Sequence, residues 1–136
     1  MGFQLREHTA DVAVEATGGS LGEAFAAVGD GLAAAMCDDV PPDGERFDLS
    51  VVAEDREAAL FDYLDELIYQ RDVRGVLPVD NEAAVTETDD GVRVEGSARG
   101  VSLDAVAARE VKAVTYSEMA IEETDDGWRA YVVFDV

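Results

Sequence analysis

Residues 3–25, FQLREHTADVAVEATGGSLGEAF, hold the pattern that decides the fold of this chain. Residues 3–8 and 12–17 predict two short strands on either side of the turn His8-Thr9-Ala10-Asp11. Gly18-Gly19 ends the second strand, because a glycine pair interrupts regular structure. The chain is therefore expected to open with a strand pair and then to leave the sheet.

A helix is predicted to follow directly. Ser20 precedes it and Glu23 stands three residues later, which is the capping-box spacing in which each side chain bonds the other residue's backbone N–H. Apolar residues then recur at intervals of four and three, so they share one stripe of a helix of about 16 residues. These residues are Leu21, Phe25, Val28, Leu32 and Met36.

The middle of the chain predicts another strand and another helix. Residues 38–44 contain two prolines and predict a loop, and alternating apolar residues in 46–53 predict a strand. Asp55 is expected to cap a second helix that ends near Gly75 and Pro78. The apolar stripe of this helix consists of Leu60, Leu64, Leu67 and Ile68, widened by Phe61.

The last third of the chain is predicted to be mostly strands. Residues 82–88 and 92–99 predict a hairpin through the turn Asp89-Asp90-Gly91, which requires a positive φ at the glycine. Residues 101–110 carry too little pattern for a prediction, and 111–124 predict one further strand.

The pentapeptide ETDDG occurs twice, at 87–91 and 123–127. Two hairpins with the same turn chemistry explain this better than the alternative, an internal duplication, because the similarity stops outside the turns. Residues 128–134 predict the last strand. The order of elements indicates an α+β fold, a single domain over residues 1–136 with one mixed β-sheet and two helices packed on one face.

The chain is strongly acidic, since 31 Asp and Glu against 10 Lys and Arg give a formal net charge of -21. About a quarter of the residues are Leu, Ile, Val or Phe, which is enough for a hydrophobic core. The acidity argues against direct nucleic-acid binding and against anionic membranes, because affinity for phosphate needs clustered Lys and Arg. Acidic residues occur in every segment, which favours adaptation to a salty, halophilic cytoplasm over one patch for a basic partner.

A single cysteine, Cys37, excludes an intramolecular disulfide and fits a reducing, cytoplasmic location. No apolar run is long enough to span a bilayer, and no basic-then-apolar leader is found. The motifs of phosphate loops, dinucleotide sites, zinc proteases and serine hydrolases are missing. Cys37 ends an apolar helical stripe and is expected to be structural.

Carboxyl groups at the two ends of the chain predict a metal site. His8 and Asp11 are three residues apart on a tight turn, so both side chains can face one point; alternatively His8 bonds a carbonyl and Asp11 caps the turn. Asp135 ends an apolar run, and a carboxylate at the end of a buried strand is costly unless it is paired, hydrogen-bonded or bound to a metal. The terminal carboxylate of Val136 lies beside it. If the last strand lies next to the second, Asp11, Asp135 and Val136 converge as oxygen ligands for Ca²⁺, Mg²⁺ or Mn²⁺. A frayed acidic terminus is the alternative.

Lys112 is the single lysine of the chain. On a strand it shares a face with Val114 and Tyr116, whereas Ala113 and Thr115 share the other face. The lysine is expected to offset the charge of the acidic cluster or to contact a phosphate. The alternative is an ordinary exposed residue.

Five motifs together resemble the archease family. They are His8-Thr9-Ala10-Asp11, Ser20-Leu21-x-Glu23-Ala24-Phe25, residues 60–72 (LFDYLDELIYQRD), Lys112-Ala113-Val114-Thr115-Tyr116 and Val133-Phe134-Asp135-Val136. The resemblance covers nearly the whole chain, in the same order. It implies a small α+β domain with an inserted strand-helix-strand-strand unit.

The resemblance implies an accessory protein rather than an enzyme. Archeases assist the tRNA-splicing RNA ligase, which joins 2′,3′-cyclic-phosphate or 3′-phosphate ends to 5′-hydroxyl ends, by promoting its guanylylation and repeated turnover. The alternative is a chaperone or specificity modulator of a tRNA cytosine methyltransferase. The family's metal site matches Asp11, Asp135 and the terminal carboxylate of Val136, and its functional lysine matches Lys112.

One position departs from the family pattern. Archeases commonly continue Thr-Tyr-His, whereas Ser117 follows Tyr116 here, so a contact made by that histidine is in doubt for this chain. A metal-dependent enzyme with His8 as general base is the remaining hypothesis. The lack of a second histidine and of obvious substrate-anchoring cations argues against it.

Overall fold

The computed structural model describes residues 2–8 and 11–136, with the backbone alone for residues 6–8. The strands are β1 (Gly2–His8), β2 (Asp11–Gly18), β3 (Glu45–Ala53), β4 (Val76–Thr88), β5 (Gly91–Ser102), β6 (Ala113–Val114), β7 (Ala120–Thr124) and β8 (Gly127–Asp135). The helices are α1 (Leu21–Met36) and α2 (Arg56–Arg74), and a 3₁₀ turn, Leu103–Ala105, follows β5. The predicted α+β class and both predicted helices are confirmed.

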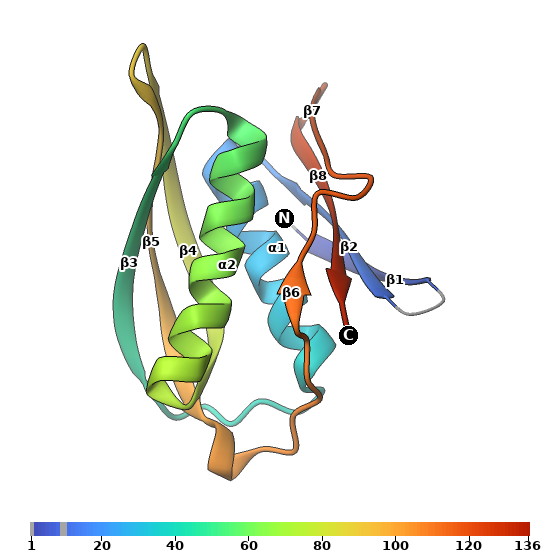
Figure 1. The fold of residues 1–136 in the computed structure, drawn as a ribbon, viewed down its shortest axis with the longest axis vertical. Helices are drawn as coiled ribbons and strands as arrows, with labels where there is room; N and C mark the ends of the chain where they lie inside the picture. The colour runs from blue at the N-terminus through green and yellow to red at the C-terminus, as the bar shows by residue number, and fades with distance from the viewer. Residues whose placement is uncertain (1, 9–10) are drawn as a thin grey trace.

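The strands form two antiparallel sheets with both helices between them (Figure 1). One sheet has the order β1-β2-β8-β6, with β7 also paired to β8, and the other has the order β3-β5-β4. The prediction of one mixed sheet with the helices on one face was wrong, because β3, β4 and β5 pair only among themselves. The consecutive elements β3, α2, β4 and β5 supply the second sheet, as expected for an inserted strand-helix-strand-strand unit.

The helices form the middle layer, so each contacts both sheets. Helix α1 packs mainly on β2 and β4, and α2 packs mainly on β3 and β4 while also touching β6 (Figure 1). The core that joins the layers includes Phe25 of α1, Leu64 of α2, Phe134 of β8 and Leu77 of β4, all fully buried. Burying large apolar side chains from all three layers is what holds the two sheets together.

The helix ends follow the predicted capping residues. Ser20 Oγ accepts a hydrogen bond from the backbone N–H of Glu23 at 3.1 Å, and Asp55 Oδ1 accepts one from Ala58 at 2.8 Å. The reciprocal bond of the predicted capping box differs: Glu23 Oε2 accepts from the backbone N–H of Gly19, one residue before the cap. This bond still satisfies a backbone donor next to the first turn.

Two turn predictions are confirmed, since Gly91 has φ 139° and Gly127 has φ 147°. The predicted strand over 111–124 was wrong as a single element. It is interrupted between β6 and β7, where Glu118 adopts a φ of 55° and the Met119 N–H donates to the Tyr116 carbonyl. Both short strands nevertheless pair with β8.

Strand β4 begins earlier than predicted, at Val76. Gly75 ends α2 in the left-handed conformation, with φ 65°, and the chain enters the strand at the next residue. Cys37 is buried, as expected for a structural cysteine. Neither described helix combines the length and apolarity needed to cross a membrane.

Candidate functional site

The register of the larger sheet brings the predicted metal ligands to one end of it. Strand β2 begins at Asp11 and β8 ends at Asp135, and these two residues are direct partners across the antiparallel pair. On the other side of β8, Ala113 pairs with Asp135, and the backbone N–H of Lys112 donates to the Asp135 carbonyl at 2.8 Å. The start of β2, the start of β6 and the end of β8 thus meet at this end of the sheet (Figure 1).

The two carboxylates lie on the outer face of the sheet. Direct partners in an antiparallel pair project to the same face, and the next pair, Val12 with Phe134, projects to the other. Phe134 is fully buried and Val12 packs against the core, so that face is the one covered by the helices. Asp11 is half-buried and Asp135 is exposed. The sequence argument that Asp135 is a buried carboxylate was therefore wrong, because water reaches this side chain.

The described side chains contain no group of three His, Cys, Asp or Glu positioned to hold a metal ion. The backbone of His8 is the partner of Asp11 on β1, but its side chain lies outside the described residues, as do Thr9 and Ala10 of the predicted turn. Val136 follows β8 and is exposed. Asp11 and Asp135 are thus adjacent in register, and the contribution of His8 stays a prediction.

Lys112 has an exposed side chain. No ion pair joins it to a carboxylate among the described residues, so its ammonium group is accessible to a partner. Ser117, at the position where archeases commonly carry histidine, is exposed and donates its backbone N–H to Thr115 Oγ1. The Thr115 hydroxyl in turn donates to the Val133 carbonyl at 2.9 Å and fastens this segment to β8.

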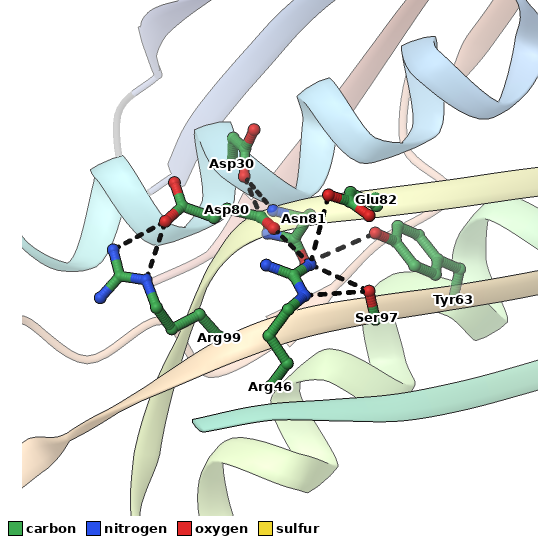
Figure 2. A network of polar contacts seen from close by, with 8 residues as sticks. All are labelled: Asp30, Arg46, Tyr63, Asp80, Asn81, Glu82, Ser97 and Arg99. Atoms are coloured by element: carbon green, nitrogen blue, oxygen red, sulfur yellow. Dashed lines mark hydrogen bonds and ion pairs between the residues drawn. The ribbon is translucent and has the colours of Figure 1, made fainter. Parts of the chain in front are cut away.

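A buried polar network that the sequence analysis missed lies between α1 and β4 (Figure 2). Asn81 is 5% exposed and occupies the β-bulge between Val79 and Glu82. Its backbone N–H and its side-chain amide both donate to Asp30 Oδ1 at 2.9 Å. The hydroxyl of Tyr63, which is fully buried on α2, donates to Asn81 Oδ1 over a long distance of 3.5 Å.

Burial governs the ionisation of this network. Desolvation raises the pKa of Asp30, although both hydrogen bonds from Asn81 oppose the shift. The pKa of the Tyr63 phenol is also raised, first by burial and then by the charge of Asp30. A neutral phenol that donates to a buried amide and an amide that donates to a carboxylate are consistent with a structural role, because they satisfy each other's hydrogen bonds.

Two arginines hold the outer side of the bulge (Figure 2). Asp80 adopts a φ of 49°, and its carboxylate pairs with Arg99 at 2.7 Å. Arg46 donates to the Asp80 carbonyl at 2.8 Å and to Ser97 Oγ at 2.9 Å. A sequence signal for this feature did exist: the dipeptide Asp80-Asn81 combines two residue types that tolerate left-handed backbone.

A surface depression lies away from the carboxylate pair, on the other sheet. It has a volume of about 800 Å³ and lies against the smaller sheet. Its lining comes from β3, β4 and β5 and includes Asp48, Ser50, Glu82, Glu95 and Ser97. It shares no lining residue with the predicted metal site.

Known proteins match the whole chain. The model of the Archease protein family matches residues 3–136. The chain is similar to the protein archease of Thermococcus gammatolerans, with 40% identity over an aligned length of 136. This alignment covers 96% of this chain and 95% of the relative. It is also similar to the protein archease of Archaeoglobus fulgidus, with 34% identity over the full length of both chains.

Two solved structures share the fold. The solution structure of Methanobacterium thermoautotrophicum protein 1598 has a TM-score of 0.84 and 31% identity, covering 99% of both chains. The crystal structure of a Thermotoga maritima archease, described as a possible chaperone, has a TM-score of 0.63 and covers 98% of this chain and 96% of its own. At 24% identity the second structure bears on the fold alone. The family model and the full-length relatives lead to one conclusion: this chain belongs to the archease family.

Proposed function

We propose that this protein is a cytoplasmic accessory factor of a tRNA-splicing RNA ligase, and that it acts through a divalent cation held at the end of the larger sheet. In this proposal it promotes guanylylation of the ligase, so that the ligase completes repeated rounds of joining 3′-phosphate or 2′,3′-cyclic-phosphate ends to 5′-hydroxyl ends. Membership of the archease family supports the partner, and the direct register of Asp11 with Asp135 supports the cation.

The donor set suits a hard cation. Like charges directly opposite each other in an antiparallel pair repel, and a cation between the carboxylates of Asp11 and Asp135 turns that repulsion into attraction. Carboxylate oxygens favour Ca²⁺, Mg²⁺ or Mn²⁺ over softer metals. The terminal carboxylate of Val136, one residue beyond Asp135, would complete an all-oxygen set, with His8 beside Asp11 as a further candidate.

The remaining residues of the site would face the partner. A bound cation would offset negative charge at this edge and offer open coordination positions to an oxygen of the ligase or its nucleotide. Lys112, which is anchored to Asp135 through its backbone, would place its ammonium group against protein or phosphate. With a net charge of -21 the protein itself is expected to leave RNA binding to the ligase.

The test is multiple-turnover RNA ligation by the cognate ligase in about 1 M KCl, where surface charge is screened. Reactions contain GTP and Mn²⁺ or Mg²⁺, with and without this protein. We expect stimulation by the native chain and its loss in Asp11→Asn, Asp135→Asn and Lys112→Ala. Asp125→Asn removes the same charge from the exposed turn between β7 and β8 and serves as the matched control.

Equal stimulation by Asp135→Asn and by the control variant would refute the metal role. No stimulation by the folded native protein would refute the ligase role altogether. The alternative is a chaperone or specificity modulator of a tRNA cytosine methyltransferase. A changed site preference of that methyltransferase, with ligation unaffected, would favour this alternative.

A further inference from the structure

Two aromatic rings are stacked on the surface where the chain leaves β6 and passes α2. Phe61 of α2 and Tyr116 have ring centroids 4.3 Å apart and planes 10° from parallel. Phe61 packs against the hydrophobic core, whereas Tyr116 is 54% exposed. One face of the Tyr116 ring is thus covered by Phe61, and much of the remaining ring surface meets solvent.

Negative charge from α2 and the residues just before it acts on Tyr116. After desolvation of the phenol, the charges of Asp62, Asp55 and Glu54 contribute to raising the pKa of Tyr116, because negative charge disfavours a second anion nearby. Asp55 and Glu54 also line a notch of about 520 Å³ between the start of α2 and the β4–β5 hairpin. The other carboxylates of that notch are Glu57, Glu87, Asp89 and Asp90. The exposed ring of Tyr116 therefore lies in the negative potential of Asp62, Asp55 and Glu54.

Elsewhere the chain supplies its own cation to aromatic rings. Arg56 lies 4.7 Å from the ring centre of Trp128, Arg74 lies 4.6 Å from that of Phe47, and Arg129 lies 5.8 Å from that of Tyr131. Among the described residues no guanidinium lies over Phe61 or Tyr116. Arg56, the arginine within the notch, is already engaged by Trp128 and by Glu87 at 3.0 Å.

We propose that the exposed ring of Tyr116, stacked on Phe61 and in the negative potential of nearby carboxylates on α2 and just before it, is a docking site for an arginine side chain from a basic segment of a partner protein. The open ring face offers the π surface on which a planar guanidinium stacks, and the carboxylates accept its N–H groups. This combination favours arginine over lysine, because an ammonium group is compact, strongly hydrated and unable to stack through a plane.

The docking site adjoins the candidate metal site along the chain. Lys112 and Tyr116 are four residues apart, which spans about 13 Å of extended backbone. One partner surface can therefore cover both. The arginine site nevertheless stands on its own contacts and does not require the metal or the ligase, so the two proposals can fail separately.

The test uses two synthetic peptides with the same Gly-Ser spacing, one carrying two arginines and the other two lysines. Each is titrated into the full chain in about 1 M KCl, so that attraction to the overall charge is screened. Binding is followed by NMR of the Phe61 and Tyr116 ring and amide signals. We expect the arginine peptide to shift these signals and to bind at least about 3-fold more tightly than its lysine twin.

Substitutions then separate the ring from the charge. Tyr116→Leu removes the π face and is expected to weaken binding of the arginine peptide by about 3- to 10-fold, whereas Tyr116→Phe is expected to retain binding. Asp62→Asn is expected to weaken binding of the arginine peptide as well. Asp125→Asn, the same change in the β7–β8 turn, is expected to leave this binding unchanged. Equal binding of both peptides, or signal shifts spread over the whole surface in all variants, would overturn the proposal. So would unchanged binding to Tyr116→Leu.

Discussion

One carboxylate oxygen of Asp30 accepts two hydrogen bonds from Asn81, one from the backbone and one from the side-chain amide, each 2.9 Å long. This pair ties the middle of α1 to the bulge of β4. Burial raises the pKa of Asp30 above its ordinary value of 3.8 in spite of both bonds. The native protein therefore holds this proton more tightly than the unfolded chain does.

The free energy of unfolding of Asp30→Asn, relative to that of the native sequence, is expected to increase as the pH rises. Because the pKa of Asp30 is raised in the native state, its contribution to stability is complete below pH 3.8. This contribution declines as the pH rises through the native pKa. Asparagine still accepts both bonds through its side-chain carbonyl but does not ionise. Urea unfolding between about pH 4 and pH 7 in high salt measures the difference. A difference that is constant over this range would contradict the prediction.

Gly127→Ala is expected to destabilise the chain by about 1–3 kcal/mol. Gly127 has φ 147°, and an added Cβ would collide with the backbone carbonyl of Gly18. Gly75→Ala is the matched control, because Gly75 also has a positive φ of 65° but an added Cβ meets nothing within 4 Å. Denaturant unfolding should show a clearly larger loss for Gly127→Ala. Equal losses would mean that strain, and not the close approach to Gly18, governs both sites.

Removal of divalent cations is expected to lower the thermal stability of the native chain, as a consequence of the proposed metal site. At a cation concentration 100 times the Kd, binding adds about 2.7 kcal/mol. Asp135→Asn is expected to lose this response and, with chelator present, to equal or exceed the native stability, because a like-charge pair is gone. Melting curves with Ca²⁺, Mn²⁺ or EDTA measure both effects. Asp48→Asn, on the other sheet, should keep the full response.

Potassium chloride is expected to stabilise the fold. A net charge of -21 on 136 residues makes the compact state repel itself in dilute buffer. The Debye length falls from about 10 Å at 0.1 M salt to about 3 Å at 1 M, so most of the gain should be complete near 1 M. Unfolding midpoints across a KCl series check this. A midpoint that is independent of KCl would contradict the interpretation of the acidic surface as salt adaptation.

The sequence was sufficient wherever the cause of a structure is local. Ser20 and Asp55 begin their helices because a side-chain oxygen reaches a backbone N–H three residues ahead. Gly91 and Gly127 turn their hairpins because glycine accepts a positive φ. Each of these outcomes depends on a few consecutive residues.

The candidate site was predictable only in its residue types. Asp11 and Asp135 could be named as partners because a family resemblance and an apolar last strand both indicated them, but their register is set by the pairing of β2 with β8. The exposure of Asp135 was missed, because an apolar neighbourhood in sequence does not show which face of a strand meets water. The Asp30–Asn81–Tyr63 network joins three elements, and the dipeptide Asp80-Asn81 marks the bulge of β4 but not its partners on α1 and α2.

By itself the sequence determined the element types, the helix caps, the turn glycines and the archease resemblance, since these depend on neighbouring residues. Only the tertiary structure decided that the strands divide into two antiparallel sheets around the helices. It also decided that β6 and β7 separate where Glu118 turns the chain. Strand alternation states which residues share a face but not which strand lies beside them, and that choice is made by the burial of apolar side chains from distant segments.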